Sequence, residues 1–153
     1  MLLFTPGPTP VPESVRQAIA IPTLHHRTPE FEAIFKEARE RLLKLLGMDE
    51  CVIIASSGTG AMQASVLNLC KRKALTINAG KFGERFGKIA DAMGKEKVEL
   101  KYEWNTPSSV ADVEKALSEH ADIDAIFIQV CESAGGLRHP VEAIAKRAKE
   151  INP

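Results

Sequence analysis

Residues 51–64, CVIIASSGTGAMQA, form the stretch that decides the fold. Its apolar, partly β-branched beginning predicts a strand over residues 51–56, and the part that follows suits a helix over residues 59–69. A short turn of Ser and Gly joins the two. A strand that leads through such a turn into a helix is the repeating unit of α/β domains.

The turn at residues 57–60 is a candidate anion site. The first N–H groups of a helix have no partner within the helix, and the helix dipole adds partial positive charge, so a phosphate fits there. Ser57 and Thr59 add hydroxyl donors, while Gly58 lets the backbone approach a ligand closely. An ordinary strand-to-helix turn without a ligand explains the same residues, and both interpretations stay open at this point.

The chain on either side predicts an α/β fold with a parallel-type sheet flanked by helices. Strands are expected at residues 74–78, 98–104 and 123–130, with helices ending near residues 93, 120 and 151. This alternation is typical of parallel strands with helices on the faces of the sheet. Before residue 51 we expect a proline-rich extended arm at residues 5–12, a short helix to residue 20, and an amphipathic helix between Thr28 and Gly47.

Composition excludes several functional classes. The 153 residues suit one domain, and 20 basic residues balance 20 acidic ones, so nothing suggests binding to nucleic acid or an acidic membrane. No apolar run approaches the roughly 18 residues of a membrane span, and the N-terminus lacks the features of a secretory signal. The three cysteines are widely spaced, and the adjacent His25 and His26 lack a third ligand, so we expect no disulfide framework, no metal site and a cytoplasmic protein.

Three glycine-bearing loops, at residues 57–60, 78–83 and 132–136, are expected at the carboxyl edge of the sheet, where ligands bind in such folds. Gln63 replaces the third glycine of the dinucleotide fingerprint, and the Walker and nucleophile-elbow patterns are absent. A flat aromatic cofactor with one phosphate remains, with its ring stacked on Phe82. Phe82 is equally compatible with an ordinary core position.

Three motifs carry a resemblance to a known family: TPGPTPVP at residues 5–12, HRTPEF at residues 26–31, and SGT at residues 57–59 followed by Ala61 and Met62. They occur in the order found in the N-terminal half of class V pyridoxal-phosphate aminotransferases, and serine–pyruvate and alanine–glyoxylate aminotransferases are the most similar subgroup. The resemblance implies the fold-type-I transferase fold and a homodimer. It divides the chain into an arm with a short helix, residues 1–28, and the first part of the large cofactor-binding domain, residues 29–153.

The resemblance also implies roles for individual residues. Ser57, Gly58 and Thr59 match the residues that hold the phosphate of pyridoxal 5′-phosphate (PLP), and Phe82 falls where the family stacks an aromatic on the pyridine ring.

Ser133 falls in a loop beside the cofactor ring, which reads Glu-Ser/Thr-Ser-Thr-Gly in the family. Ala134 and Gly135 replace hydroxyl residues there, so we expect at least one lost hydrogen bond. Gly7 resembles a glycine on the substrate side.

Family members are more than twice as long as this chain. The Schiff-base lysine lies later in them, and Lys81 and Lys146 match no lysine motif of the family. We therefore expect no catalytic residue here and an inactive N-terminal fragment that self-associates through its uncovered sheet edge. The full-length protein is expected to move an amino group between a small amino acid, of the serine or alanine type, and a 2-oxo acid. Alternatives are another class V enzyme (a desulfurase, lyase or phosphonate aminotransferase) and a non-catalytic α/β anion-binding module.

Overall fold

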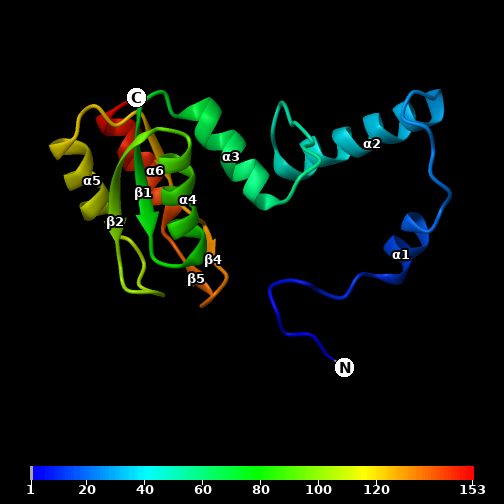
Figure 1. Cartoon of the computed structure of the whole chain (residues 1–153), viewed down its shortest axis with the longest axis horizontal. Coiled ribbons are helices and arrows are strands. Elements are labelled where there is room, and N and C mark those ends of the chain that lie inside the picture. The colour runs from blue at the N-terminus through cyan, green and yellow to red at the C-terminus, as the bar shows by residue number, and fades with distance from the viewer. Residues whose placement is uncertain (1) are drawn as a thin grey trace. The chain divides into compact units, whose positions relative to one another are not determined.

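The computed structural model describes residues 2–153, and the chain divides into two compact units, Met1–Ala55 and Ser56–Pro153 (Figure 1). Each unit is described by itself. The predicted division at residue 28 stays a prediction.

The first unit holds two helices, α1 (Glu13–Ile19) and α2 (Pro29–Leu46). Helix α2 begins and ends as the sequence predicts. The Thr28 hydroxyl accepts a hydrogen bond from the Phe31 N–H at 3.4 Å, and Pro29 occupies the first helical position. Gly47, with a φ of 64°, ends the helix in the left-handed conformation that glycine adopts without strain.

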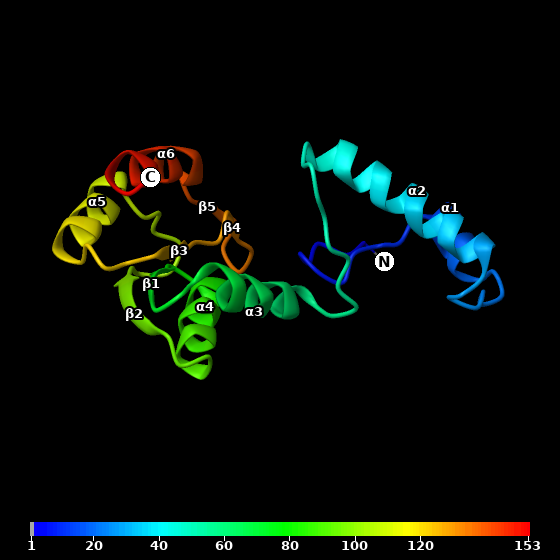
Figure 2. The same ribbon diagram turned by 90° about the horizontal axis from the view of Figure 1, so that it is seen from above.

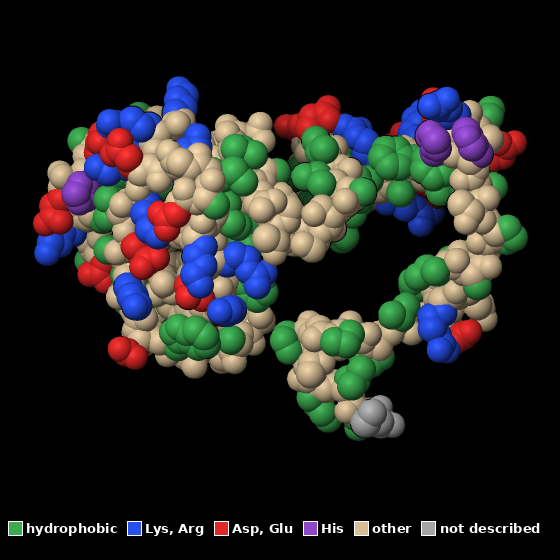
Figure 3. Space-filling model, viewed as in Figure 1, with side chains coloured by type: hydrophobic (Ala, Val, Ile, Leu, Met, Phe, Trp, Pro, Cys, Tyr) green, Lys and Arg blue, Asp and Glu red, His purple; other side chains and the backbone are tan. Residues whose placement is uncertain are grey.

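Helix α2 is amphipathic, but its apolar side is not covered within the described residues. None of its residues is buried, and Ile34 and Leu45 are 56% and 79% exposed. Figure 3 shows hydrophobic side chains between charged ones along this helix. An apolar helix face of this size is typical of a surface that packs against another element.

The strand predicted for residues 51–56 is not formed. This segment has no regular secondary structure, and Val52 is 86% exposed. The β-branched apolar pattern shows only that the segment suits a strand, because a strand also needs a neighbour to which its backbone can hydrogen-bond. Within residues 2–153 no strand pairs with it.

The second unit contains the parallel sheet. Strands β1 (Lys73–Asn78), β2 (Glu96–Lys101) and β3 (Ala125–Phe127) form it in the order β2-β1-β3, with Leu75 opposite both Val98 and Ile126. The predicted α/β class is confirmed, although β3 is shorter than expected. The short antiparallel pair β4 (Cys131–Glu132) and β5 (Leu137–Arg138), which the sequence did not predict, follows β3.

Four helices cover the two faces of this sheet: α3 (Gly58–Leu69), α4 (Lys81–Ala92), α5 (Val110–Glu119) and α6 (Val141–Ile151). Figure 2 shows α3 and α4 on one side and α5 and α6 on the other. Side chains of β1 alternate between two hydrophobic clusters, so that Ala74 packs with α3 and α4 while Leu75 packs with α5 and α6. The central strand is therefore buried on both faces.

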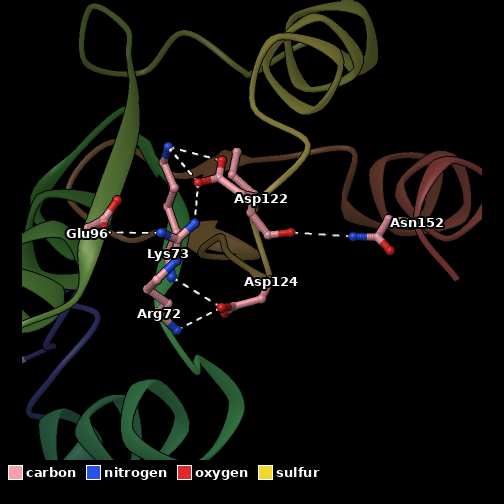
Figure 4. Close-up of polar contacts among 7 residues, drawn as sticks. Arg72, Lys73, Glu96, Asp122, Asp124 and Asn152 are labelled. Atoms are coloured by element: carbon pink, nitrogen blue, oxygen red, sulfur yellow. Dashed lines mark hydrogen bonds and ion pairs between the residues drawn. The ribbon is translucent and has the colours of Figure 1, made fainter.

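A polar network holds the amino end of β1 (Figure 4). The Asp124 carboxylate accepts hydrogen bonds from the backbone N–H groups of Lys71, Arg72 and Lys73, at 3.0, 2.7 and 3.2 Å. Arg72 and Lys73 also pair with Asp122. The loop before β3 is thus attached to the start of β1, which leaves the opposite, carboxyl end of β1 for the loops of the candidate site.

Charges of both signs are interspersed on the face that carries α4 and β2 (Figure 3). Among residues 2–153, no helix is both long enough and apolar enough to cross a membrane.

Candidate functional site

The N-terminus of α3 is a helix start whose donors are not used by its own cap. Ser57 is the N-cap residue in extended conformation, and its side chain makes no capping hydrogen bond. Its carbonyl accepts from the N–H groups of Gly60 and Ala61, at 2.9 and 3.4 Å. The N–H groups of Gly58 and Thr59 precede these and have no partner within the helix. Two N–H groups and two hydroxyls therefore converge at this end.

The two glycines of this turn differ in their surroundings. A Cβ on Gly60 would lie 2.1 Å from the Ser56 hydroxyl oxygen, so the turn closes only with glycine there. A Cβ on Gly58 would meet no atom within 4 Å, so the space in front of this residue is open. The turn is therefore closely packed at Gly60 and unobstructed beside Gly58.

Helix α4 presents the opposite case, because a side chain of the protein already fills its N-terminus. The Glu132 carboxylate is 1% exposed and accepts from the N–H groups of Phe82, at 3.1 Å, and Gly83. A carboxylate at a helix N-terminus satisfies its donors and matches the helix dipole. Of these two helix starts in the unit, α3 is thus the one left for an anion from solution.

Glu132 also shapes the turn that carries Ser133. Its backbone carbonyl accepts from the N–H groups of Gly135 and Gly136, at 3.2 and 2.9 Å. Ser133, which is half-buried, follows directly in this turn. Through its carboxylate and its carbonyl, Glu132 therefore connects the loop of Phe82 with the loop of Ser133.

Arg85 is a residue that the sequence reasoning missed. Its Nη1 donates to the Thr59 hydroxyl oxygen at 2.9 Å, and its guanidinium lies over the Phe82 ring, 4.9 Å from the ring centroid. The available sequence signal was the spacing of three residues between Phe82 and Arg85, which puts both on one side of a helix. The structure thus links Thr59 to Phe82 through Arg85.

Phe82 has a mixed environment. Its side chain is half-buried and packs against the hydrophobic cluster between α3, α4 and the sheet. The alternative that Phe82 is a core residue therefore describes part of its contacts. Gly7 lies in the first unit and is exposed, and its substrate-side role stays a prediction.

Asn105 brings the loop after β2 to the same edge. Its N–H donates to the Ala79 carbonyl at 3.1 Å, and its φ of 66° is the left-handed conformation that Asn tolerates better than most residues. A Cβ on Gly135 would lie 1.5 Å from the Asn105 side-chain oxygen. The carboxamide of Asn105 therefore occupies the space beside Gly135, which the sequence did not indicate.

The buried His139 lies outside this group of contacts, and its Nε2 has no hydrogen-bond partner among the described residues. His139 is buried, and its Nδ1 lies 3.1 Å from both the N–H and the hydroxyl of Ser108. Burial lowers the pKa of His139, although Glu132 acts in the opposite direction. An open cleft between β2 and α5, lined in part by Tyr102 and Asp112, does not include the α3 N-terminus. Within residues 2–153, no group of three or more His, Cys, Asp and Glu side chains is arranged to hold a metal ion.

The comparisons with known proteins identify what this chain resembles. An uncharacterized aminotransferase from Helicobacter pylori strain J99 is 55% identical over 153 residues, which is all of this chain and 42% of that relative. The predicted resemblance to aminotransferases is confirmed. No family model matches the chain.

Solved aminotransferase structures agree. An aspartate aminotransferase of subgroup IV from Thermus thermophilus superposes with a TM-score of 0.89 at 32% identity, covering 100% of this chain and 43% of that one. An alanine–glyoxylate aminotransferase from Nostoc sp. gives a TM-score of 0.87 at 25% identity, covering 96% and 40%. The aminotransferase-like chain thus spans less than half the length of these proteins and corresponds to their N-terminal region.

Proposed function

We propose that the gene product carrying this chain is a PLP-dependent aminotransferase of class V. The observation that carries this proposal is the free N-terminus of α3, whose Thr59 is joined through Arg85 to Phe82. The α3 N-terminus offers N–H and hydroxyl donors to a phosphate. Phe82 offers an aromatic face to the ring that carries this phosphate. Similarity to named aminotransferases over the whole chain supports the same chemistry.

The residues fit the cofactor in kind and arrangement. In the proposal, Ser57, Gly58 and Thr59 bind the phosphate, Phe82 stacks on the pyridine ring, and Ser133 donates to the ring substituents from the neighbouring loop. When bound, PLP supplies an electron sink for the substrate carbanion. The chain's own contribution is to anchor the phosphate, orient the ring and limit access of water to one of its faces.

The proposed reaction moves an amino group between a small amino acid of the serine or alanine type and a 2-oxo acid. The alanine–glyoxylate aminotransferase from Nostoc supports this substrate class, while the aspartate enzyme from Thermus shows that the fold also serves other amino donors. Gly7 is proposed to lie on the substrate side. We further propose a homodimer, because the apolar side of α2 is exposed and suits a second copy. A cytoplasmic location is proposed as well, because the three cysteines are widely spaced and form no disulfide framework.

The phosphate assignment is tested with Ser57→Ala and Thr59→Val in the complete gene product. Both variants should lose PLP faster than wild type during dialysis, as followed by cofactor absorbance, because each removes a hydroxyl donor. Ser57→Ala should leave stability nearly unchanged, since this hydroxyl does not cap its own helix.

Ser109→Ala is the matched control. Ser109 is the N-cap of α5, and its hydroxyl accepts from the Asp112 N–H at 3.0 Å. Its replacement should cost about 1 kcal/mol of stability and leave PLP retention unchanged. Equal PLP retention by wild type, Ser57→Ala and Thr59→Val would refute the phosphate assignment, and a gene product that binds anions but no PLP would favour the anion-binding module.

Two further measurements address the remaining proposals. Residues 1–153 alone should not catalyse transamination, since no lysine in them is assigned to the cofactor aldehyde; measurable turnover contradicts this.

Light scattering should give a self-associated species, and a monomer at micromolar concentration contradicts the dimer.

A further inference from the structure

Arg85 contacts two residues of the proposed cofactor site that come from different helices. Its Nη1 lies 2.9 Å from the hydroxyl oxygen of Thr59 on α3, and its guanidinium carbon lies 4.9 Å from the centroid of the Phe82 ring on α4. The side chain is half-buried between the two helices. Arg85 is therefore placed to fix the position of the Thr59 hydroxyl relative to the aromatic ring.

The hydrogen bond determines what the Thr59 hydroxyl offers to a ligand. A guanidinium only donates, so the Thr59 oxygen is the acceptor in this contact. The hydroxyl proton then points away from the guanidinium and is available for donation. A hydroxyl group that accepts a hydrogen bond from a charged donor is also polarised, so its own proton is donated more strongly. The ligand that suits Thr59 is thus an acceptor, and an anion above all.

Arg85 also differs from three lysines around α4. Lys81 and Lys88 both pair with Glu84, and Lys97 pairs with Asp91. Among the ion pairs within residues 2–153, none includes Arg85. Its positive charge is therefore not neutralised by a carboxylate, and it adds to the positive end of the α3 dipole where the proposed phosphate binds.

We infer that Arg85 is the positioning residue that makes this site select ligands with a phosphate on a flat aromatic ring over the same ring without phosphate. It acts through Thr59, whose hydroxyl it orients, and through its uncompensated charge. This inference rests on the proposed function, because it assumes that the α3 N-terminus receives the cofactor phosphate.

The test compares the affinities of PLP and pyridoxal, which differ only in the phosphate, for the complete gene product. Arg85→Gln should lower the preference for PLP over pyridoxal by about tenfold, the effect of one lost charged hydrogen bond, so that PLP affinity falls much more than pyridoxal affinity. Arg85→Lys should restore part of the preference, because it keeps the charge without the planar fork. Once Thr59→Val is present, adding Arg85→Gln should have a smaller effect than it has alone.

Arg147→Gln is the matched control. Arg147 on α6 pairs with Glu114 and Glu150, so its loss affects stability between α5 and α6 but not the preference. If Arg85→Gln and Arg85→Lys weaken both ligands equally, or if the effects of Arg85→Gln and Thr59→Val on the preference simply add, the inference is overturned while the proposed function stands. A wild-type protein without preference for PLP overturns the proposed function itself.

Discussion

The carboxylate of Glu132 lies 3.1 Å from the backbone nitrogen of Phe82, although 50 residues separate them in the sequence. Because the same carboxylate also accepts from Gly83, the start of α4 is tied to the end of β4. Phe82, the proposed stacking residue, is thereby held by a buried anion inside the protein.

Glu132→Gln should lower the free energy of unfolding by about 2 kcal/mol, because a side-chain amide accepts through one oxygen and leaves a buried N–H without a partner. Denaturant unfolding of the chain measures this. Glu142→Gln is the control, since Glu142 pairs with Arg138 at the surface and its loss should cost no more than about 0.5 kcal/mol. Equal stabilities of the two variants contradict the proposed role of the Glu132 carboxylate.

Gly83→Ala should destabilise the fold by about 3 kcal/mol, as overpacking against backbone does. A Cβ there would lie 2.3 Å from the Ile77 carbonyl oxygen and 3.0 Å from the Asn78 Cα, and neither atom moves without displacing β1. Gly58→Ala, where no atom lies within 4 Å, should leave the unfolding midpoint nearly unchanged. A Gly83→Ala chain as stable as wild type would show that α4 packs farther from β1 than these distances require.

Asp124→Asn should lower stability by about 1.5 kcal/mol near neutral pH, because the charged acceptor of three backbone N–H groups is lost. Desolvation by neighbouring atoms opposes ionisation of the exposed Asp124, but hydrogen bonds from the backbone N–H groups of Arg72 and Lys73 outweigh it and lower the pKa below the usual 3.8. A lowered pKa gives stability that is present above pH 3.8 and lost as the pH falls through the folded-state value. The difference between wild type and variant should therefore shrink in acid.

Glu119→Gln serves as the control for Asp124, since Glu119 forms only an exposed pair with Lys115 at 3.9 Å. Urea unfolding of both variants over a range of pH gives the comparison. A stability difference for Asp124→Asn that does not change with pH would argue against the ionised acceptor.

Tyr102 should titrate at unusually high pH. Burial and a hydrogen bond of 2.9 Å to the Asp112 carboxylate raise its pKa from 10.0 to about 12. Since it is the single tyrosine of the chain, near-ultraviolet absorbance of tyrosinate follows this group alone. The contribution of Tyr102 to stability is fully present below pH 10 and is lost as the pH rises towards 12.

Asp112→Asn should move the Tyr102 midpoint back towards 10, because the carboxylate that disfavours tyrosinate is gone. Asp112 itself has a lowered pKa through hydrogen bonds from Ser109 and Tyr102, so it is ionised over the whole titration. A native midpoint equal to that of the chain in denaturant would contradict the contact.

The sequence predicted local structure well where neighbouring residues decide it. Thr28, Pro29 and Gly47 bound α2 as expected, because caps and turn glycines act within a few residues. The α3 start at Gly58 and the parallel strands after it also follow the predicted pattern. The strand predicted for residues 51–56 was wrong because strand formation depends on distant residues: a strand is stable only when another strand pairs with it.

The sequence by itself determined the α/β class and the helix boundaries, because periodicity and capping are local properties, whereas Ser57, Gly58 and Thr59 were predicted as phosphate residues through the resemblance to a family. Only the tertiary structure decided that Glu132 fills the α4 N-terminus and leaves α3 open, and that Arg85 joins Thr59 to Phe82. These contacts cross 50 and 26 residues of sequence. They exist because the packing of α3, α4 and β4 at one edge of the sheet brings those side chains within hydrogen-bonding distance, and no local pattern encodes that distance.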